Sequence, residues 1–275
     1  MAEASEIREE FAALEEWQQF AASHPAVFDP AFIDRVADQI RASGLYFAFG
    51  DEHVPPASVA IDGDNYRETI VYRGVNSRQR AVLEEILRCL GDRHDHSCKI
   101  YSPEAFSAFA LLLRSRYPRF IGSEYTDDPK LLEAIYPVPI ENLLSLSFKS
   151  DSFHVVAVND VFEHVPDIPR VLGEIARILE PGGSLVSTFP FHPAAAGIEK
   201  ARLTAHGIEY LTEPEYHGDP INPGGALVFK IPGWDILDEC RAARFSEARM
   251  VYVLSQSRGI LAPQLGGVFV LVARK

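Results

Sequence analysis

The stretch DSFHVVAVNDVFEHVPDIPRVLGEIARILEPGGSLVSTFP, residues 151–190, decides the fold. It holds two short apolar runs, at residues 154–158 and 184–189, with a helical pattern at residues 168–179 between them. Apolar runs of this length that are bounded by turn residues are typical of buried strands. A strand, a helix and a second strand in this order are typical of parallel strands joined by a right-handed crossover. The stretch therefore predicts part of an open α/β sheet.

The same alternation extends towards the N-terminus. Apolar runs at residues 99–101 and 119–122 alternate with helical patterns at residues 105–116 and 130–135. Repeated strand–helix order favours a parallel sheet with helices on its faces. We therefore expect an α/β domain over residues 92–275.

The C-terminal part of this domain has a different pattern. A helix is predicted near residues 234–243, followed by strands at residues 250–254 and 268–273. The link between the two strands is too short for a crossover helix and is rich in glycine. This pattern favours an antiparallel pair at one edge of the sheet.

Residues 1–91 are expected to form a separate, mainly helical N-terminal appendage. Its clearest signal is a helix that begins after the N-cap Asp29 and ends just before Gly44. The predicted elements are helices at residues 7–18, 30–43 and 76–90 and a short β-hairpin between residues 59 and 72.

Composition narrows the class of protein. The chain has 26 Lys and Arg against 39 Asp and Glu, a net charge of −13, which makes general nucleic-acid binding unexpected. Three scattered cysteines, Cys89, Cys98 and Cys240, do not form a disulfide framework. The acidic start lacks the pattern of a secretory signal, and no apolar run is long enough to span a bilayer. We therefore expect a soluble, cytoplasmic protein that does not bind membranes.

The opening stretch also carries a recognisable motif order. Residues 160–164 read DVFEH, residues 177–180 read RILE, and residues 181–183 read PGG. This run resembles the class I S-adenosylmethionine-dependent methyltransferases, in the branch often labelled methyltransferase type 11. The resemblance implies a Rossmann-like seven-stranded sheet with an antiparallel last strand. It also implies S-adenosyl-L-methionine as cofactor, bound at the carboxyl ends of the first, second and fourth strands.

The resemblance assigns roles to several residues near those strand ends. Glu124 would accept hydrogen bonds from both ribose hydroxyls, and Tyr125 would cover the adenine. Asn142 would receive the adenine amino group, although capping a turn is an equally good reading of it. For Glu124 the alternative is an ordinary surface carboxylate. The predicted cofactor-binding residues are Tyr101, Ser102, Glu104, Glu124, Tyr125, Asn142, Leu143, Asn159, Asp160 and Phe162.

The loop after the first strand departs from the family. Relatives have an acidic residue followed by G-x-G-x-G, where the glycines let the backbone approach the cofactor closely. Here Tyr101 stands at the acid, and the three glycines are replaced by Pro103, Ala105 and Ser107. Glu104 could substitute for the missing acid. Either the cofactor binds in an altered pose, or the chain has the fold without this ligand.

Candidate catalytic residues lie in the motif and in an insertion at residues 192–232. His164 could act as a general base, or could only orient the loop that contains it. Tyr216 and His217 belong to the insertion, which occupies the place of a lid or a substrate-binding element. A packed surface loop is an equally good reading of these two residues.

No metal site is predicted from spacing. His94, His96 and Cys98 are ligand types at close spacing, but no second pair follows them, which favours a polar loop.

Two hypotheses of function follow. The first is a methyltransferase that acts on a small-molecule acceptor. The second is a non-catalytic methyltransferase-like protein that serves as a binding module or a partner in a complex. A different nucleotide ligand in the same cleft is a third, weaker reading. Self-association into a homodimer is left open.

Overall fold

The computed structural model describes residues 5–91 and 96–275. The chain forms two compact units, of which the first comprises Met1–Gly91 and Arg249–Val272. The second comprises Asp92–Ala248 and Ala273–Lys275. We describe each unit by itself.

Four parallel strands form the centre of the second unit. They are β6 (Lys99–Ser102), β7 (Arg119–Gly122), β8 (Phe153–Asn159) and β9 (Leu179–Thr188). Strand β6 pairs in parallel with both β7 and β8, and β8 pairs in parallel with β9. The predicted alternation of strands and helices is therefore confirmed. All four strands place their carboxyl ends at one edge of the sheet.

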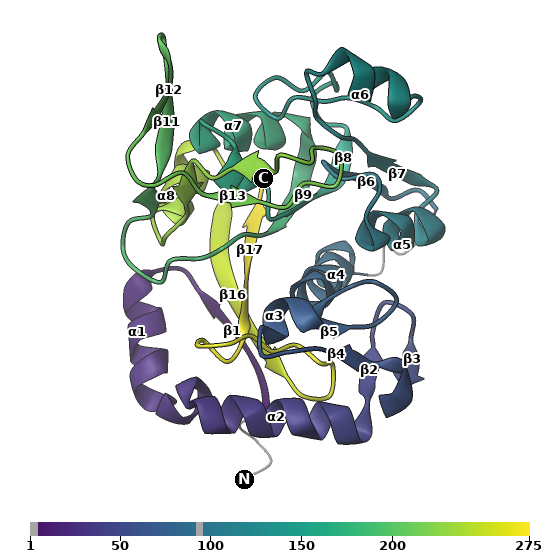
Figure 1. The fold of residues 1–275 in the computed structure, drawn as a ribbon, viewed down its shortest axis with the longest axis vertical. Helices are drawn as coiled ribbons and strands as arrows, with labels where there is room; N and C mark the ends of the chain where they lie inside the picture. Colours follow the sequence, from purple (N-terminus) through teal and green to yellow (C-terminus); the bar gives the residue numbers. More distant parts are fainter. Residues whose placement is uncertain (1–4, 92–95) are drawn as a thin grey trace. The chain divides into compact units, whose positions relative to one another are not determined.

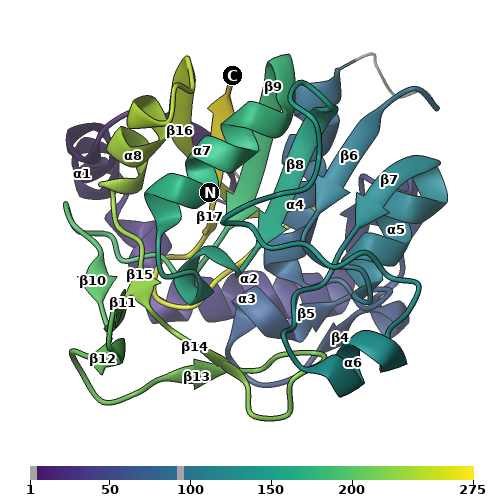
Figure 2. The same ribbon diagram turned by 90° about the horizontal axis from the view of Figure 1, so that it is seen from above.

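Five helices of the described residues accompany these strands in the second unit. They are α5 (Ala108–Arg116), α6 (Pro129–Ala134), the short 3₁₀ helix η4 (Phe162–His164), α7 (Ile168–Ile178) and α8 (Ile236–Ala242). Helix α7 begins where Asp167 accepts a hydrogen bond from the Arg170 amide, and it buries an apolar stripe that includes Val171 and Ile175. Figure 2 shows α7 lying along β8 and β9. No helix among residues 5–91 and 96–275 combines the length and the apolar character that crossing a membrane requires.

Small two-stranded ribbons follow β9 in the second unit. They pair β10 (Ile198–Glu199) with β15 (Lys230–Ile231), β11 (Ala201–Thr204) with β12 (Gly207–Tyr210), and β13 (Tyr216–His217) with β14 (Ala226–Leu227). The β11–β12 ribbon projects as a green finger in Figure 1. The predicted insertion at residues 192–232 thus contains regular structure.

Seven strands make up the mixed sheet, in the order β1-β16-β17-β9-β8-β6-β7. The α/β class and the count of seven are confirmed, and the seventh strand lies where the sequence pattern predicted a helix. It is β1 (Glu6–Phe11), which pairs antiparallel with β16 (Glu247–Ser255). The remaining strand is β17 (Val268–Arg274). Between β7 and β8 the chain forms two isolated bridges, a parallel one between Glu124 and Ile140 and an antiparallel one between Asn142 and Ser145.

The helix predicted at residues 7–18 is therefore wrong in its first half. Residues 6–11 pair with β16 through six consecutive partners, and α1 (Leu14–Ser23) begins only afterwards. The Arg8 guanidinium donates two hydrogen bonds of 2.8 Å to the Glu85 carboxylate. These bonds tie a side chain of the strand to a residue outside the sheet. Pairing with another strand has overridden the local helical pattern.

Two helices of the first unit begin at the cap residues that the sequence indicates. Helix α2 (Pro30–Ser43) begins at Asp29, which accepts from the Ala31 amide, and ends at Gly44 with φ 76°. Helix α4 (Ser77–Leu90) begins with a capping box between Asn76 and Gln79. Both helices are confirmed. The other elements are η2 (Pro25–Phe28), β2 (Leu45–Phe47), β3 (Glu52–Val54), η3 (Pro56–Ser58), β4 (Ala60–Ile61), α3 (Tyr66–Thr69) and β5 (Ile70–Val71).

The predicted hairpin is only partly right. Strand β4 pairs with β5, but residues 66–69 between them form one helical turn, α3, rather than part of a strand. Strands β2 and β3 form a second antiparallel pair that the sequence did not predict.

Candidate functional site

The carboxyl ends of β6, β7 and β8 bring several predicted residues together. Parallel strands of an open sheet present their ends at one edge, where ligands usually bind. Ser102 ends β6, Asn159 ends β8, and Glu124 follows β7 by two residues. Ser102 is buried and donates a hydrogen bond of 2.8 Å to the Ala157 carbonyl.

Glu104 faces the end of β8. Its Oε1 accepts a hydrogen bond of 2.6 Å from Nδ2 of Asn159. The other side-chain atom of Asn159, the acceptor Oδ1, is buried and has no hydrogen-bond partner among the residues that the structure describes. A carboxylate beside an unpartnered amide oxygen is a suitable environment for an ammonium group, which donates three hydrogen bonds and accepts none. Glu104 and Asn159 together form such an environment at the end of β8.

Glu124 holds the loop that follows β6. Its Oε1 accepts hydrogen bonds from the backbone amides of Ala105, at 2.8 Å, and Phe106, at 3.3 Å. The side chain is buried, and desolvation raises the pKa of the carboxyl group. Both bonds end on Oε1, so the loop engages one oxygen of the predicted ribose-binding carboxylate and leaves Oε2 without a bond to the loop.

The loop without glycines is accommodated by a glycine on the neighbouring strand. A Cβ added to Gly122 in β7 would lie 2.6 Å from the Glu104 carbonyl oxygen. The close backbone approach therefore occurs between the loop and β7. Ser107, at the third glycine position, caps α5 by accepting from the Ala110 amide at 3.0 Å.

Three other predicted cofactor residues lie in the core. Tyr101 is fully buried, shares a hydrogen bond of 2.9 Å with Ser123, and packs against Phe148. Burial raises the pKa of its phenol. Leu143 and Phe162 are also buried, and Phe162 packs near Phe189.

The remaining predicted cofactor residues, Asn142, Tyr125 and Asp160, lie in three different environments. Asn142 Oδ1 accepts from the Leu144 amide at 2.9 Å, which matches the turn-capping alternative. Tyr125 is exposed over 58% of its surface. Asp160 has φ 49°, in the left-handed region, and turns the chain from β8 into η4.

A second group of residues surrounds Glu163. The side chain of Glu163 is completely buried, and neither of its oxygens has a hydrogen-bond partner among the described residues. Nε2 of His164 lies 3.6 Å and Nδ1 of His217 lies 3.7 Å from Glu163 Oε1. The two imidazole rings are 5.1 Å apart and perpendicular. The structure thus unites two predicted catalytic histidines that are 53 residues apart in the sequence.

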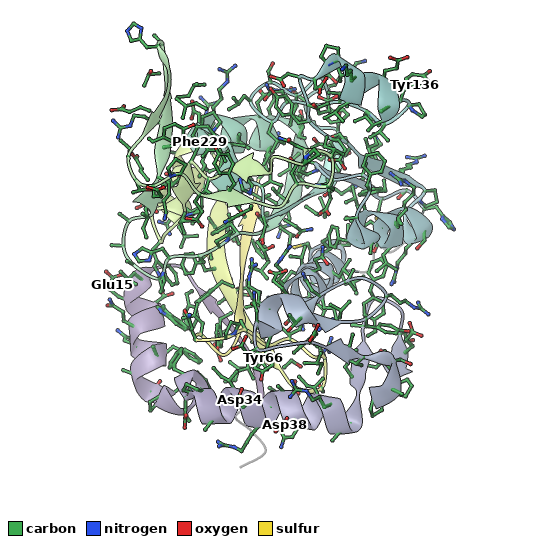
Figure 3. All side chains as sticks on the ribbon, viewed as in Figure 1. Glu15, Asp34, Asp38, Tyr66, Tyr136 and Phe229 are labelled. Atoms are coloured by element: carbon green, nitrogen blue, oxygen red, sulfur yellow. The ribbon has the colours of Figure 1, made fainter. Side chains whose placement is uncertain are left out.

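The insertion builds this group. The amide of Phe229, labelled in Figure 3, donates a hydrogen bond of 2.7 Å to the Glu163 carbonyl. Nδ1 of His164 donates to the Leu227 carbonyl at 2.9 Å, and Nε2 of His217 donates to the Glu215 carboxylate at 3.2 Å. The pKa of His217 is raised, chiefly by the Glu163 carboxylate.

Tyr216 does not join this group. Adjacent residues of a strand point to opposite faces, so Tyr216 points away from the side that His217 faces. Its side chain is 53% exposed, and a hydrogen bond with Tyr210 raises the pKa of its phenol.

Sequence reasoning missed Glu163 as a site residue, although it stands inside the quoted DVFEH motif. The sequence feature that could have indicated Glu163 is a carboxylate next to a histidine, just after a predicted strand. Glu215 and the Leu227 carbonyl gave no signal. Of the residues considered for a metal, His94 lies outside the described residues, His96 is exposed and Cys98 is buried.

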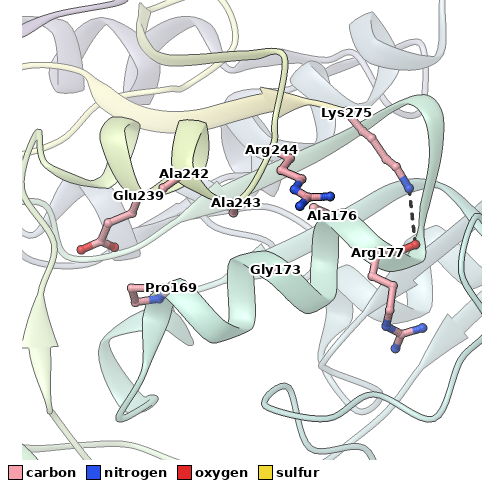
Figure 4. Close-up of a pocket in the computed structure, with 9 residues that line it drawn as sticks. All are labelled: Pro169, Gly173, Ala176, Arg177, Glu239, Ala242, Ala243, Arg244 and Lys275. Atoms are coloured by element: carbon pink, nitrogen blue, oxygen red, sulfur yellow. Dashed lines mark hydrogen bonds between the residues drawn. The ribbon is translucent and has the colours of Figure 1, made fainter.

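A cavity of about 560 Å³ lies elsewhere in the second unit, between α7 and α8 (Figure 4). Its lining includes Gly173 and Ala176 of α7 and Glu239 and Ala242 of α8. None of its lining residues comes from the strand ends described above.

Comparisons with known proteins agree with the motif order. Residues 123–187 match the family model of a methyltransferase domain. No curated protein matches the chain.

Solved structures give partial matches. An S-adenosylmethionine-dependent methyltransferase from Mesorhizobium loti is 16% identical, with 70% of this chain and 98% of that chain covered and a TM-score of 0.42. A Thermotoga maritima protein described as a possible histamine N-methyltransferase is 17% identical, with 72% and 87% covered and a TM-score of 0.40. Against two others, from Galdieria sulphuraria and Bacillus, the chain spans 46% and 51% of their length, with TM-scores of 0.32 and 0.29.

The matched segment contains both Glu124 and the DVFEH motif, and it ends within β9. Residues 123–187 of the chain are therefore similar to a methyltransferase domain, and the parallel strands β8 and β9 of the α/β sheet lie in or overlap this segment.

Proposed function

We propose that this chain is an S-adenosylmethionine-dependent methyltransferase that acts on a small-molecule acceptor. The observation that carries the proposal is the pairing of Glu104 with Asn159 at the end of β8. It provides a carboxylate and an unpartnered amide oxygen for the ammonium of the methionine part, although the usual acid is a tyrosine here. When bound, the cofactor supplies an electrophilic methyl group on a sulfonium.

Other residues of the chain have complementary roles in this proposal. The oxygen Oε2 of Glu124, to which the loop makes no bond, would accept from the ribose, while Oε1 keeps the loop in place. His164 and His217 lie beyond the end of β8, where they would contact the acceptor and take up its proton. We do not extend the catalytic role to Tyr216, because it faces the other side of its ribbon. Aligning the acceptor with the methyl group is the main task that remains for the site.

The cofactor part of the proposal is tested by calorimetric titration with S-adenosylmethionine and S-adenosylhomocysteine. We expect binding to the unmodified protein and an affinity that is about 10- to 100-fold weaker in Glu104→Gln and in Glu124→Gln, since each removes a charged acceptor. Glutamine keeps an oxygen that can accept from the Ala105 amide, so the loop stays anchored in the second variant. Glu209→Gln, on the exposed ribbon β11–β12, is the matched control.

A non-catalytic methyltransferase-like protein is the second candidate. The observation that favours it is the loop, which lacks all three glycines and already engages one oxygen of Glu124. Absence of heat with either ligand at high concentration would contradict the enzyme and support this candidate. Binding that survives both substitutions would refute the roles given to Glu104 and Glu124. If binding is seen, formation of S-adenosylhomocysteine in a screen of small-molecule acceptors tests the reaction itself.

A further inference from the structure

The environment of Glu163 is unusual for a buried carboxylate. Burying a charge without hydrogen-bonding partners is costly, and buried carboxylates are normally paired or coordinate metals. Both oxygens of Glu163 are buried and lack a hydrogen-bond partner among the described residues. The two nearest imidazole nitrogens stand at 3.6 and 3.7 Å, which is too far for a hydrogen bond.

The same distances suit two ligands of one ion. Zinc lies about 2.0–2.2 Å from imidazole nitrogen and from carboxylate oxygen, which separates two such ligands by about 3.3–3.6 Å at tetrahedral to trigonal angles. Ligand atoms of Glu163, His164 and His217 all lie within 4.8 Å of one another. The distances from Glu163 Oε1 to the two imidazole nitrogens are therefore too long for hydrogen bonds and close to the spacing of two ligands around one ion.

The outer nitrogen of each imidazole is already committed. The Leu227 carbonyl can only accept, so His164 carries its proton on Nδ1 and, when neutral, directs the lone pair of Nε2 towards Glu163. In the same way the Glu215 carboxylate accepts from Nε2 of His217, which leaves Nδ1 facing Glu163. Imidazoles that bind metals typically donate their other nitrogen to a carbonyl or a carboxylate in this manner.

We propose that Glu163, His164 and His217 form a binding site for a divalent first-row transition metal ion. Two imidazoles and one carboxylate favour zinc, manganese, cobalt or iron(II) over magnesium, which prefers an all-oxygen environment. Three protein ligands leave open positions on the ion for water or for an acceptor oxygen. The inference goes beyond the proposed function and does not depend on methyl transfer; while the ion is bound, His164 and His217 are its ligands and do not accept a proton.

The ion can reach this site from solvent. The side chain of His217 is 32% exposed and that of His164 is 15% exposed, while Glu163 closes the inner side. The competing occupant of the same space is a proton, which would convert one imidazole into an imidazolium paired with Glu163. The two readings differ in whether the purified protein takes up a metal ion.

The test is metal binding to the full chain after treatment with a chelator, without cofactor or acceptor. Equilibrium dialysis with Zn²⁺ and the visible absorption of Co²⁺ are the two readouts. We expect one ion per chain, a much weaker affinity for Mg²⁺, and a Co²⁺ spectrum that indicates nitrogen and oxygen ligands. His217→Ala and Glu163→Gln should weaken binding by more than about 100-fold, and Glu215→Gln by about tenfold, because it acts through His217.

His206→Ala is the matched control, because His206 is an exposed histidine in the turn between β11 and β12. It should leave affinity and spectrum unchanged. Failure of the unmodified protein to bind Zn²⁺ or Co²⁺ stoichiometrically would overturn the proposal in favour of the proton. Binding that is unchanged in His217→Ala would also overturn it, because the ion would then lie elsewhere. His217 is partly exposed, so this variant remains decisive if Glu163→Gln does not fold.

Discussion

Two buried charges, one in each unit, have opposite environments. Arg80 in the first unit is 2% exposed, and its guanidinium donates hydrogen bonds to four backbone carbonyls, those of Ile70, Val75, Arg258 and Gly259. Glu163 in the second unit is equally buried, but its oxygens have no hydrogen-bond partner among the described residues. Burial lowers the pKa of Arg80 to about 9, which still leaves it charged at neutral pH.

The comparison separates a structural charge from a candidate ligand-binding charge. The backbone carbonyls around Arg80 accept its hydrogen bonds, so its buried charge needs no added ligand. Glu163 is surrounded by two imidazoles whose outer nitrogens are committed elsewhere. A carboxylate in such a position is stabilised only by something added, whether a proton or a metal ion. Burial alone therefore does not indicate a functional site, whereas a buried carboxylate with neither oxygen partnered is a candidate for one.

The largest expected effect is on the structural side of this comparison. Arg80→Met should lower the free energy of unfolding by about 3 kcal/mol or more, because it leaves several buried carbonyls without donors. Urea denaturation followed by circular dichroism measures it. Arg88→Met on the same helix is the control, since Arg88 is 51% exposed in its ion pair with Glu85. Equal stability of the Arg80 variant and the parent would remove the contrast between the two charges.

In metal-stripped protein, Glu163→Gln should not lower the free energy of unfolding, in contrast to Arg80→Met. Replacing an unsolvated charge by a neutral amide is expected to leave the free energy of unfolding unchanged or to raise it by about 1 kcal/mol. With Zn²⁺ added, the parent should gain stability and the variant should not, because only the parent binds the ion tightly. A loss of several kcal/mol in the stripped variant would show that Glu163 is already paired, like Arg80.

The third expected effect concerns the ribbon that carries His217. Gly225 has φ 75°, and a Cβ there would lie 2.5 Å from the His217 carbonyl oxygen. Gly225→Ala should therefore displace His217 and weaken Co²⁺ binding about tenfold, as expected for a change in the residues that orient a ligand. Gly218→Ala is the control, because a Cβ at Gly218 meets no atom within 4 Å. Similar affinities in the two variants would argue against His217 as a ligand.

Much of the fold could be predicted because its signals are local. The strands and helices around the DVFEH motif follow from apolar periodicity, and α2 and α4 follow from Asp29 and Asn76 as N-caps. Strand β1 could not be predicted, since residues 6–11 become a strand only by pairing with residues that lie about 240 positions later.

The candidate site was predictable as single residues and not as an arrangement. His164 and His217 were each selected for their chemistry, but nothing in the sequence shows that both face Glu163. The role of Glu104 depended on its distance from Asn159, which only the folded chain sets. Gly122 leaves room for the loop without glycines, and this role becomes visible only when β6 and β7 are paired.

The ribbon of β13 and β14 has a consequence for how the two proposals are connected. It supplies His217 itself and, through Leu227, the carbonyl that fixes the proton on His164. An ion bound to both histidines would therefore hold this ribbon against η4, and by reciprocity anything that holds the ribbon there would tighten the ion. An acceptor that packs on the ribbon would then raise the metal affinity in proportion to its own gain in affinity. The insertion would act as a thermodynamic link between recognition of the acceptor and assembly of the metal centre.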